Sequence, residues 1–129
     1  MELSTVGDIT YLGAREDRNF TPAVIAGGLV HVSGQASVDL ETGAIISGTF
    51  EEEMRRCVAN LETLLVAAGS SLRHVVRIGA FVTAEDQIPE YNRIYRELFA
   101  HPRPARTTWV SPLESVKVEL DAVAVLARP

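Results

Sequence analysis

The stretch TFEEEMRRCVANLETLLVAAG, residues 49–69, decides the fold because apolar residues take up helical spacing here. Thr49 followed by Glu52 has the pattern of a capping box at a helix start, and Gly69 has the properties of a helix stop. Between them, apolar residues recur at every third or fourth position, the spacing of one helix face. They are Phe50, Met54, Cys57, Val58, Leu61, Leu64, Leu65 and Ala68. The pattern predicts a long amphipathic helix.

The sequence before this helix has the pattern of three short strands. The first lies near Ile9–Leu12. The run AVIAGGLVHVSGQASV, residues 23–38, predicts two strands that meet at Gly27-Gly28, a dipeptide typical of two-residue hairpins. Thr42-Gly43 marks a second turn in the segment that leads into the helix.

The sequence after the helix predicts a strand, a second helix and two more strands. HVVRIGAFVT, residues 74–83, is β-branched and nearly continuous in apolar residues, as buried strands are. The second helix has Pro89 near its first turn and ends at HPRP. Its apolar face consists of Ile88, Tyr91, Ile94, Tyr95, Leu98 and Phe99. Arg106–Ser111 and Lys117–Ala127 close the chain as strands. The predicted order is β-β-β-α-β-α-β-β, an α+β sheet in one domain spanning residues 1–129.

One face of this predicted sheet lacks a cover. Six strands make a sheet about 29 Å wide, whereas two helices of about 10 Å diameter cover about 20 Å of one face only. The strands are nevertheless apolar on both faces: Val123 and Val125 alternate with Ala122 and Ala124 in the last strand. An uncovered apolar face implies another subunit. We expect a homo-oligomer, and a closed symmetric ring satisfies this requirement.

Composition narrows the class of protein. The 129 residues are 47% hydrophobic and 22% charged, with a formal net charge of −5. An acidic chain is a poor candidate for nucleic-acid binding. The single cysteine excludes an internal disulfide and favours a reducing compartment. The first residues lack a signal-peptide pattern, and no apolar run is long enough to span a membrane. We expect a cytoplasmic protein.

The residue patterns of several common catalytic and ligand-binding sites are absent from the sequence. His31, His74 and His101 are far apart and have no metal-ligand spacing. Cys57 lies within the apolar stripe of the first helix and is interpreted as a core residue. The chain has no nucleophile elbow, P-loop or dinucleotide fingerprint. The glutamates at 51–53 are interpreted as a solvated first turn favoured by the helix dipole.

Three polar residues interrupt strands that otherwise bury their side chains. Ser33 follows Val32, Arg106 opens a strand after two prolines, and Glu119 interrupts the last strand. A charge in such a strand is costly unless it is paired. One interpretation is a structural salt bridge between Arg106 and Glu119. The other is a small polar pocket at a subunit interface, whose cation binds an anionic substrate.

Five segments resemble one known family. LVHVSGQASVDLETGAIISG, NLETLLVAAGSSLRHVVRIGAFV, YNRIYRELF, RPARTTW and KVELDAVAV occur in the order and spacing of the RidA family, also called YjgF/YER057c/UK114. The similarity runs from about Asn19 to Leu126. It implies a chorismate-mutase-like homotrimer with sites in the clefts between subunits. It also implies cofactor-independent hydrolysis of reactive enamines and imines, which carry a carboxylate, to 2-keto acids and ammonia.

The resemblance assigns roles to individual residues. Arg106 matches the arginine that binds the substrate carboxylate, and Glu119 matches the glutamate that positions or activates water. Ser33 and Asn92 match polar residues that line the pocket. Gly34 matches a small residue beside the serine, and its missing side chain is expected to leave room for substrate.

This chain departs from the family pattern at four positions. Phe20 keeps the ring of the usual tyrosine but loses its hydroxyl, and Pro22 replaces a glutamine. Thr108 stands where a cysteine or another small residue is common, and Trp109 is bulky for its position. A larger, pathway-specific enamine is therefore a candidate substrate.

Two other function classes remain open at this stage. One is a trimer that binds a small carboxylate as a sensor or accessory protein without turnover. The other is a nuclease, which the acidic balance and the lack of a metal or histidine pair disfavour, unless trimerisation brings Arg73, Arg77 and Arg93 into one stripe.

Overall fold

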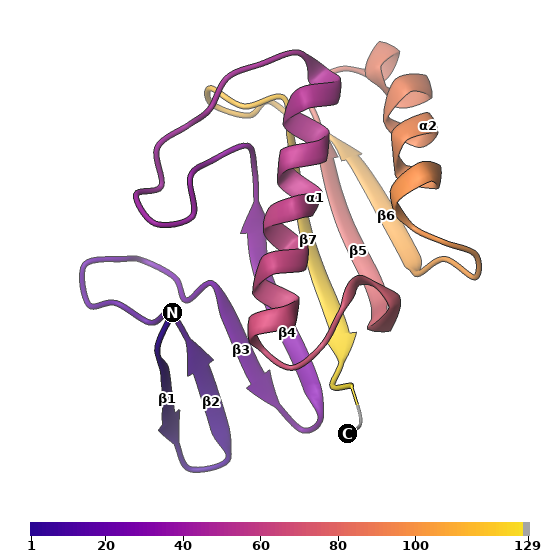
Figure 1. Cartoon of the computed structure of the whole chain (residues 1–129). Helices are drawn as coiled ribbons and strands as arrows, with labels where there is room; N and C mark the ends of the chain where they lie inside the picture. The colour runs from indigo at the N-terminus through magenta and orange to yellow at the C-terminus, as the bar shows by residue number, and fades with distance from the viewer. Residues whose placement is uncertain (128–129) are drawn as a thin grey trace.

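The sheet has seven strands in the order β1-β2-β3-β4-β7-β5-β6, and both α-helices cover one of its faces (Figure 1). This computed structural model describes residues 1–127, so the last two residues of the predicted domain lie outside it. All neighbouring strands are antiparallel except β5 and β6, which α2 connects as a parallel pair. The strands are β1 (Leu3–Val6), β2 (Ile9–Leu12), β3 (Ala23–Ala26), β4 (Leu29–Gln35), β5 (Val75–Val82), β6 (Ala105–Val110) and β7 (Val118–Val125). The predicted α+β class and one-sided helix layer are confirmed.

The turn between β3 and β4 is the predicted two-residue hairpin. Gly27 and Gly28 have φ angles of 58° and 77°, which glycine adopts without steric cost. The hairpin aligns Ala23 with Val32, and both are buried under the helices.

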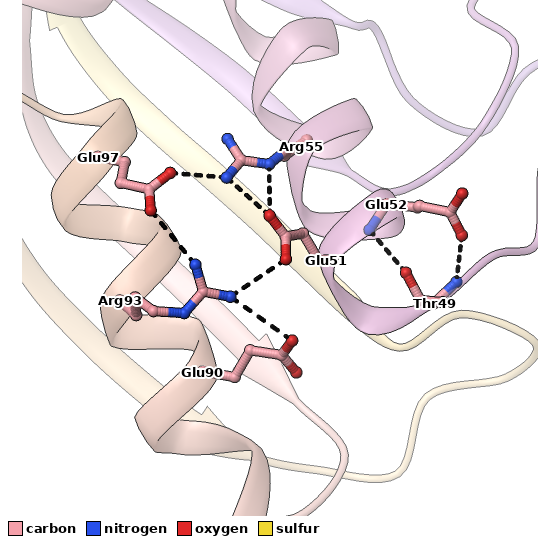
Figure 2. Close-up of polar contacts among 7 residues, drawn as sticks. All are labelled: Thr49, Glu51, Glu52, Arg55, Glu90, Arg93 and Glu97. Carbon is pink, nitrogen blue, oxygen red and sulfur yellow. Dashed lines mark hydrogen bonds and ion pairs between the residues drawn. The ribbon is translucent and has the colours of Figure 1, made fainter.

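The helix α1 (Phe50–Ala67) starts and ends where the sequence predicts. The Thr49 hydroxyl accepts the Glu52 amide N–H, and the Glu52 carboxylate accepts the Thr49 amide N–H, which completes the capping box (Figure 2). Gly69 follows with a φ of +89°, as expected for a helix stop. Cys57 is fully buried and its thiol donates to the Gln35 carbonyl oxygen, which confirms its assignment to the core.

The glutamates of the first turn of α1 do not share one solvated role, so that interpretation is wrong for Glu53. Glu53 is fully buried and accepts backbone N–H groups from Gly48 and Lys117. The Lys117 ammonium lies 3.0 Å from the same carboxylate. Glu53 therefore ties the start of α1 to the segment that leads into β7.

The helix α2 (Ile88–Leu98) packs beside α1 over β5 and β6, and charged side chains bridge the two helices (Figures 1 and 2). Arg55 of α1 contacts Glu51 and Glu97, and Arg93 of α2 contacts Glu51, Glu90 and Glu97. Beneath this network, Tyr91, Ile94 and Tyr95 bury the apolar face of the helix.

The N-terminal hairpin contains a strand that the sequence analysis missed. The sequence predicts one strand near Ile9–Leu12, whereas β1 and β2 form a pair that aligns Leu3 with Leu12. All four residues of β1 are exposed, so the strand has no buried face and leaves no alternation of apolar and polar residues to detect.

The two faces of the sheet differ in what covers them. In β7, Val118, Leu120, Ala122 and Ala124 are buried under the helices. The alternate residues lie on the open face, which no helix of the described residues covers. Exposed apolar residues of this face include Trp109 and Val125, with Val76 at the bulge of β5. The layout supports the expected homo-oligomer. No helix among residues 1–127 is long and apolar enough to cross a membrane.

Candidate functional site

Arg106 and Glu119 leave opposite faces of the sheet of one chain. Arg106 pairs in register with Ile78, whose side chain is buried under the helices. Glu119 pairs with Phe81, on the open face. Among residues 1–127, neither side chain forms an ion pair. The structural salt bridge considered from the sequence is therefore wrong.

Glu119 lines a cavity of about 410 Å³ at one end of β4 and β7. Phe20, which is half exposed, and Gly34 line the same cavity. A Cβ atom added to Gly34 would lie 2.9 Å from Cδ of Glu119. The missing side chain of Gly34 thus leaves room for the Glu119 carboxylate, and this differs from the expectation that it leaves room for substrate.

The surroundings of Glu119 favour its protonated form. Burial raises the pKa of this carboxyl above its ordinary 4.5, and the negative charge of Asp121 on the same face raises it further. Among the described residues, no hydrogen bond to this carboxylate opposes these effects. A carboxylate whose pKa is moved toward neutrality and that faces a cavity is suited to general acid–base chemistry.

Arg106 lies at the edge strand β6, on top of two aromatic rings of α2. Its guanidinium carbon is 4.8 Å from the ring centre of Tyr91 and 4.6 Å from that of Tyr95. Such stacking holds the guanidinium plane while its N–H groups stay available. Arg106 also lines a second cavity of about 330 Å³, together with Asn92 and Tyr95. The Arg106 guanidinium is therefore held in place at this edge and, among residues 1–127, forms no ion pair with a carboxylate.

Thr108 lies next to the aromatic pair. Its hydroxyl oxygen is 2.9 Å from that of Tyr91, so the two side chains share a hydrogen bond. Burial raises the pKa of Tyr91, and burial together with the neighbouring Tyr91 raises the pKa of Tyr95 to about 12. The sequence predicts both tyrosines on the apolar face of this helix, but it does not predict their contact with Arg106. Their spacing of four residues places the two rings on one face of α2, whereas the contact with Arg106 depends on where β6 lies.

The remaining predicted residues divide between these two groups. The Ser33 hydroxyl donates to the Thr21 carbonyl oxygen at 2.6 Å, which fixes the segment that carries Phe20 beside the Glu119 cavity. Asn92 lies with Arg106. One chain therefore holds the predicted site as two halves. Phe20, Ser33, Gly34 and Glu119 form one half, and Asn92, Arg106 and Thr108 form the other.

Within one chain, two of the arginines considered for nucleic-acid binding, Arg77 and Arg93, lie on opposite sides of the sheet. Arg93 contacts three glutamates in the network between the helices. Arg77 lies on the open face and donates to the Thr107 hydroxyl. Among residues 1–127, no group of three or more His, Cys, Asp or Glu side chains is placed to hold a metal ion.

Comparisons with known proteins identify relatives over most of the chain. Residues 14–126 match the model of the family described as endoribonuclease L-PSP. A mitochondrial protein of Schizosaccharomyces pombe, mmf2, is 38% identical over 81% of this chain and 86% of its own length. The human 2-iminobutanoate/2-iminopropanoate deaminase is 29% identical over 82% of this chain and 79% of its own length. A YjgF protein family member from Neisseria meningitidis superposes with a TM-score of 0.83 at 25% identity, covering 95% of this chain and 98% of that one.

Proposed function

Because this chain belongs to the endoribonuclease L-PSP family, which is the YjgF/RidA family, we propose that it hydrolyses reactive enamines and imines to 2-keto acids and ammonia. The human relative is named for such a deamination. The substrate carries a carboxylate, and the reaction needs no cofactor. The proposal covers 2-iminobutanoate, 2-iminopropanoate and their enamine tautomers, or a larger enamine of the same type.

The observation that carries the proposal is the environment of Glu119. A half-buried carboxylate with a raised pKa lines a cavity large enough for a small metabolite and a water molecule. The position matches the glutamate to which the family resemblance assigns water activation. Such a group can accept a proton from water near neutral pH.

The reaction proceeds through the imine tautomer. Arg106 binds the substrate carboxylate with two parallel N–H donors, which its stacking on Tyr91 and Tyr95 holds in plane. Glu119 accepts a proton from water as the water oxygen bonds to the imine carbon. Glu119 returns this proton to the nitrogen, which gives the carbinolamine. It then moves the proton of the carbinolamine hydroxyl to the amino group. The carbon–nitrogen bond breaks as the carbonyl forms, and ammonia leaves the keto acid. Imines hydrolyse readily in water, so positioning and electrostatics are sufficient and no covalent nucleophile is needed.

The site is assembled from two subunits in this proposal. Arg106 and Glu119 leave opposite faces of one sheet, so one chain cannot present both to one small substrate. A homotrimer that places the β6 edge of one subunit against the Glu119 cavity of the next joins the two halves in each cleft. The uncovered apolar face supplies surface for this assembly.

The first test is release of 2-oxobutanoate from 2-iminobutanoate generated in place by an amino-acid oxidase. Semicarbazide competes for the imine, so an active enzyme lowers the semicarbazone yield and raises the yield of keto acid. We expect acceleration by the wild type and its loss in Arg106→Ala. Absence of acceleration by a folded wild-type oligomer would contradict deamination of this substrate.

A mixing experiment tests the shared site. Arg106→Ala and Glu119→Gln subunits are unfolded together, refolded together and compared with each variant refolded alone. If the residues meet across an interface, random mixing restores about one quarter of the clefts to a complete pair. If both residues served one site within a chain, the mixture would stay inactive.

A trimer that only binds small carboxylates is the alternative function. Phe20 is its support, because the cavity lacks the hydroxyl of the usual tyrosine. Binding of 2-oxobutanoate that requires Arg106 and is unchanged in Glu119→Gln, without turnover, would favour this function.

We place the reaction in the cytoplasm. Since the S. pombe relative is named mitochondrial, a fluorescent fusion must decide between the compartments.

A further inference from the structure

The cavity that Glu119 lines contains a second charged group that the proposed mechanism does not use, the guanidinium of Arg18. The Arg18 side chain lies against the turn of residues 39–43, and its Nη2 atom is 3.6 Å from a Cβ atom added to Gly43. The Glu119 carboxylate lies against Gly34 on β4. One cavity is thus bounded by a cation at one place and by the candidate base at another.

The donors of Arg18 are largely unused. Within residues 1–127, the one hydrogen bond of its guanidinium joins Nη2 to the Glu41 carbonyl oxygen at 3.4 Å, a long contact. Among residues 1–127 it forms no ion pair. A guanidinium carries five N–H donors in a planar fork that fits a carboxylate.

Asp39 also lines this cavity, but its carboxylate is hydrogen-bonded to its own turn and not to Arg18. One carboxylate oxygen accepts the amide N–H groups of Glu41 and Thr42 and lies 3.2 Å from the Thr42 hydroxyl. These hydrogen bonds lower the pKa of Asp39, with the Thr42 amide as the largest cause. Asp39 is therefore held by its own turn and forms no ion pair with Arg18, so the Arg18 guanidinium remains available for a ligand.

The walls between these charges are apolar. Met1, Phe20, Val38 and Leu40 line the cavity along with the charged residues. At about 410 Å³, the cavity exceeds what a three- or four-carbon imine fills, so a longer carbon chain has room.

We infer that the natural substrate carries a second carboxylate, bound by Arg18, so that the enzyme acts on 2-imino or 2-enamino dicarboxylates. This inference rests on the proposed function, in which Arg106 of the adjacent subunit binds the carboxylate next to the reacting carbon. Arg18 then fixes the far end of the carbon chain, and Glu119 faces the imine carbon between them. The second carboxylate is unchanged by the reaction, which still consumes one water and releases one ammonia.

The experiment compares 2-iminoglutarate, made from glutamate by glutamate oxidase, with 2-iminobutanoate under the same semicarbazide competition. We expect the wild type to prefer the dicarboxylate by about 10- to 100-fold in kcat/KM. Arg18→Met should remove this preference and leave the rate with 2-iminobutanoate unchanged. Arg15→Met is the matched control, since Arg15 is close in sequence but exposed and paired with Asp17.

Each outcome separates the inference from the proposed function. Turnover of both imines that needs Arg106 and Glu119, with no preference for the dicarboxylate, would overturn the inference alone. A preference that survives in Arg18→Met would also overturn it. If neither imine is hydrolysed faster than in water, the proposed deamination itself fails, and the inference fails with it.

Discussion

Glu53 at the start of α1 and Glu119 on β7 are both carboxylates withdrawn from water, yet their surroundings shift the pKa of the two side chains in opposite directions. The Glu53 side chain is 1% exposed, and three hydrogen bonds from Gly48 and Lys117 reach it. Burial alone would raise the pKa of Glu53, but these hydrogen bonds outweigh burial and lower it. For Glu119, burial and the charge of Asp121 act together and raise the pKa.

The difference separates a structural carboxylate from a reactive one. A charge whose hydrogen bonds are satisfied on all sides stabilises the fold and has no free lone pair for substrate. A charge that the protein leaves without partners beside a cavity is destabilising unless a ligand or water uses it. Substitution of each carboxylate should therefore change a different measured quantity.

The largest expected effect is on catalysis in Glu119→Gln. The amide cannot accept a proton from water, so kcat should fall by about 100- to 10,000-fold.

The folded state binds the Glu119 proton more tightly than the unfolded chain does, because the pKa of Glu119 is raised in the folded state. The stability that this provides is present at low pH and is lost as pH rises through the folded pKa. At pH 7 the variant should therefore have a Tm equal to or above that of the wild type.

The pH profile provides the control for this effect. The acidic limb of kcat/KM should lie above pH 4.5, the ordinary pKa of the side chain, and should move to lower pH in Asp121→Asn. A limb that does not move in this variant would contradict the role of Asp121.

The next effect in size is on stability in Glu53→Ala. Removal of the carboxylate leaves two amide N–H groups without a partner, that of Gly48 before α1 and that of Lys117 before β7. We expect a loss of about 2–4 kcal/mol in the free energy of unfolding. Because the pKa of Glu53 is lowered, its contribution is full above the unfolded pKa and is lost as pH falls through the folded pKa. Urea unfolding at pH 7 and pH 3 should show that the variant loses less stability on acidification than the wild type. Glu52→Ala, which removes only part of an exposed cap, should cost less than Glu53→Ala.

A smaller effect is expected on activity in Gly34→Ala. The new Cβ atom would lie 2.9 Å from Cδ of Glu119, so the flexible carboxylate must move while the backbone can stay in place. A shift of this size at a reacting group typically lowers the rate by about 10- to 100-fold. Gly48→Ala is the matched control, because its Cβ atom would lie 2.9 Å from an oxygen of Glu52, which belongs to the helix cap and not to the proposed site. Equal activity in the two variants would show that the contact between Gly34 and Glu119 has no catalytic role.

The sequence predicted the elements of this fold wherever burial leaves a periodic pattern. The helix from Thr49 to Gly69 and the turn at Gly27-Gly28 are local features, and both are confirmed. The strand β1 was missed because all its residues are exposed. Glu53 was misjudged because its partner Lys117 is 64 residues away in the chain, beyond the reach of local helix rules.

The candidate site was predictable as a list of residues but not as an arrangement. The family resemblance named Arg106 and Glu119, whereas the pairing of β6 and β7 with β5 determines that they leave opposite faces. The register of a crossover connection cannot be read from the strands alone. The stack of Arg106 on Tyr95 depends on the same register and on the packing of α2.

The smallest expected effect is on stability, at the ion pairs between α1 and α2. These carboxylates are exposed to water, unlike Glu53 and Glu119. The side chains of Glu51, Arg55, Arg93 and Glu97 are 38–52% exposed. Exposed pairs contribute little because water already solvates both charges, so Arg93→Ala should cost no more than about 1 kcal/mol in the free energy of unfolding. The loss should shrink in 1 M NaCl, where the charges are screened. A double-mutant cycle between Arg55 and Glu97, followed by urea unfolding, isolates the contact that joins α1 to α2. A coupling energy larger than exposed ion pairs normally show would mean that charge holds these helices together. The buried side chains of Tyr91 and Ile94 would then contribute less to the packing of α2 than we assign to them.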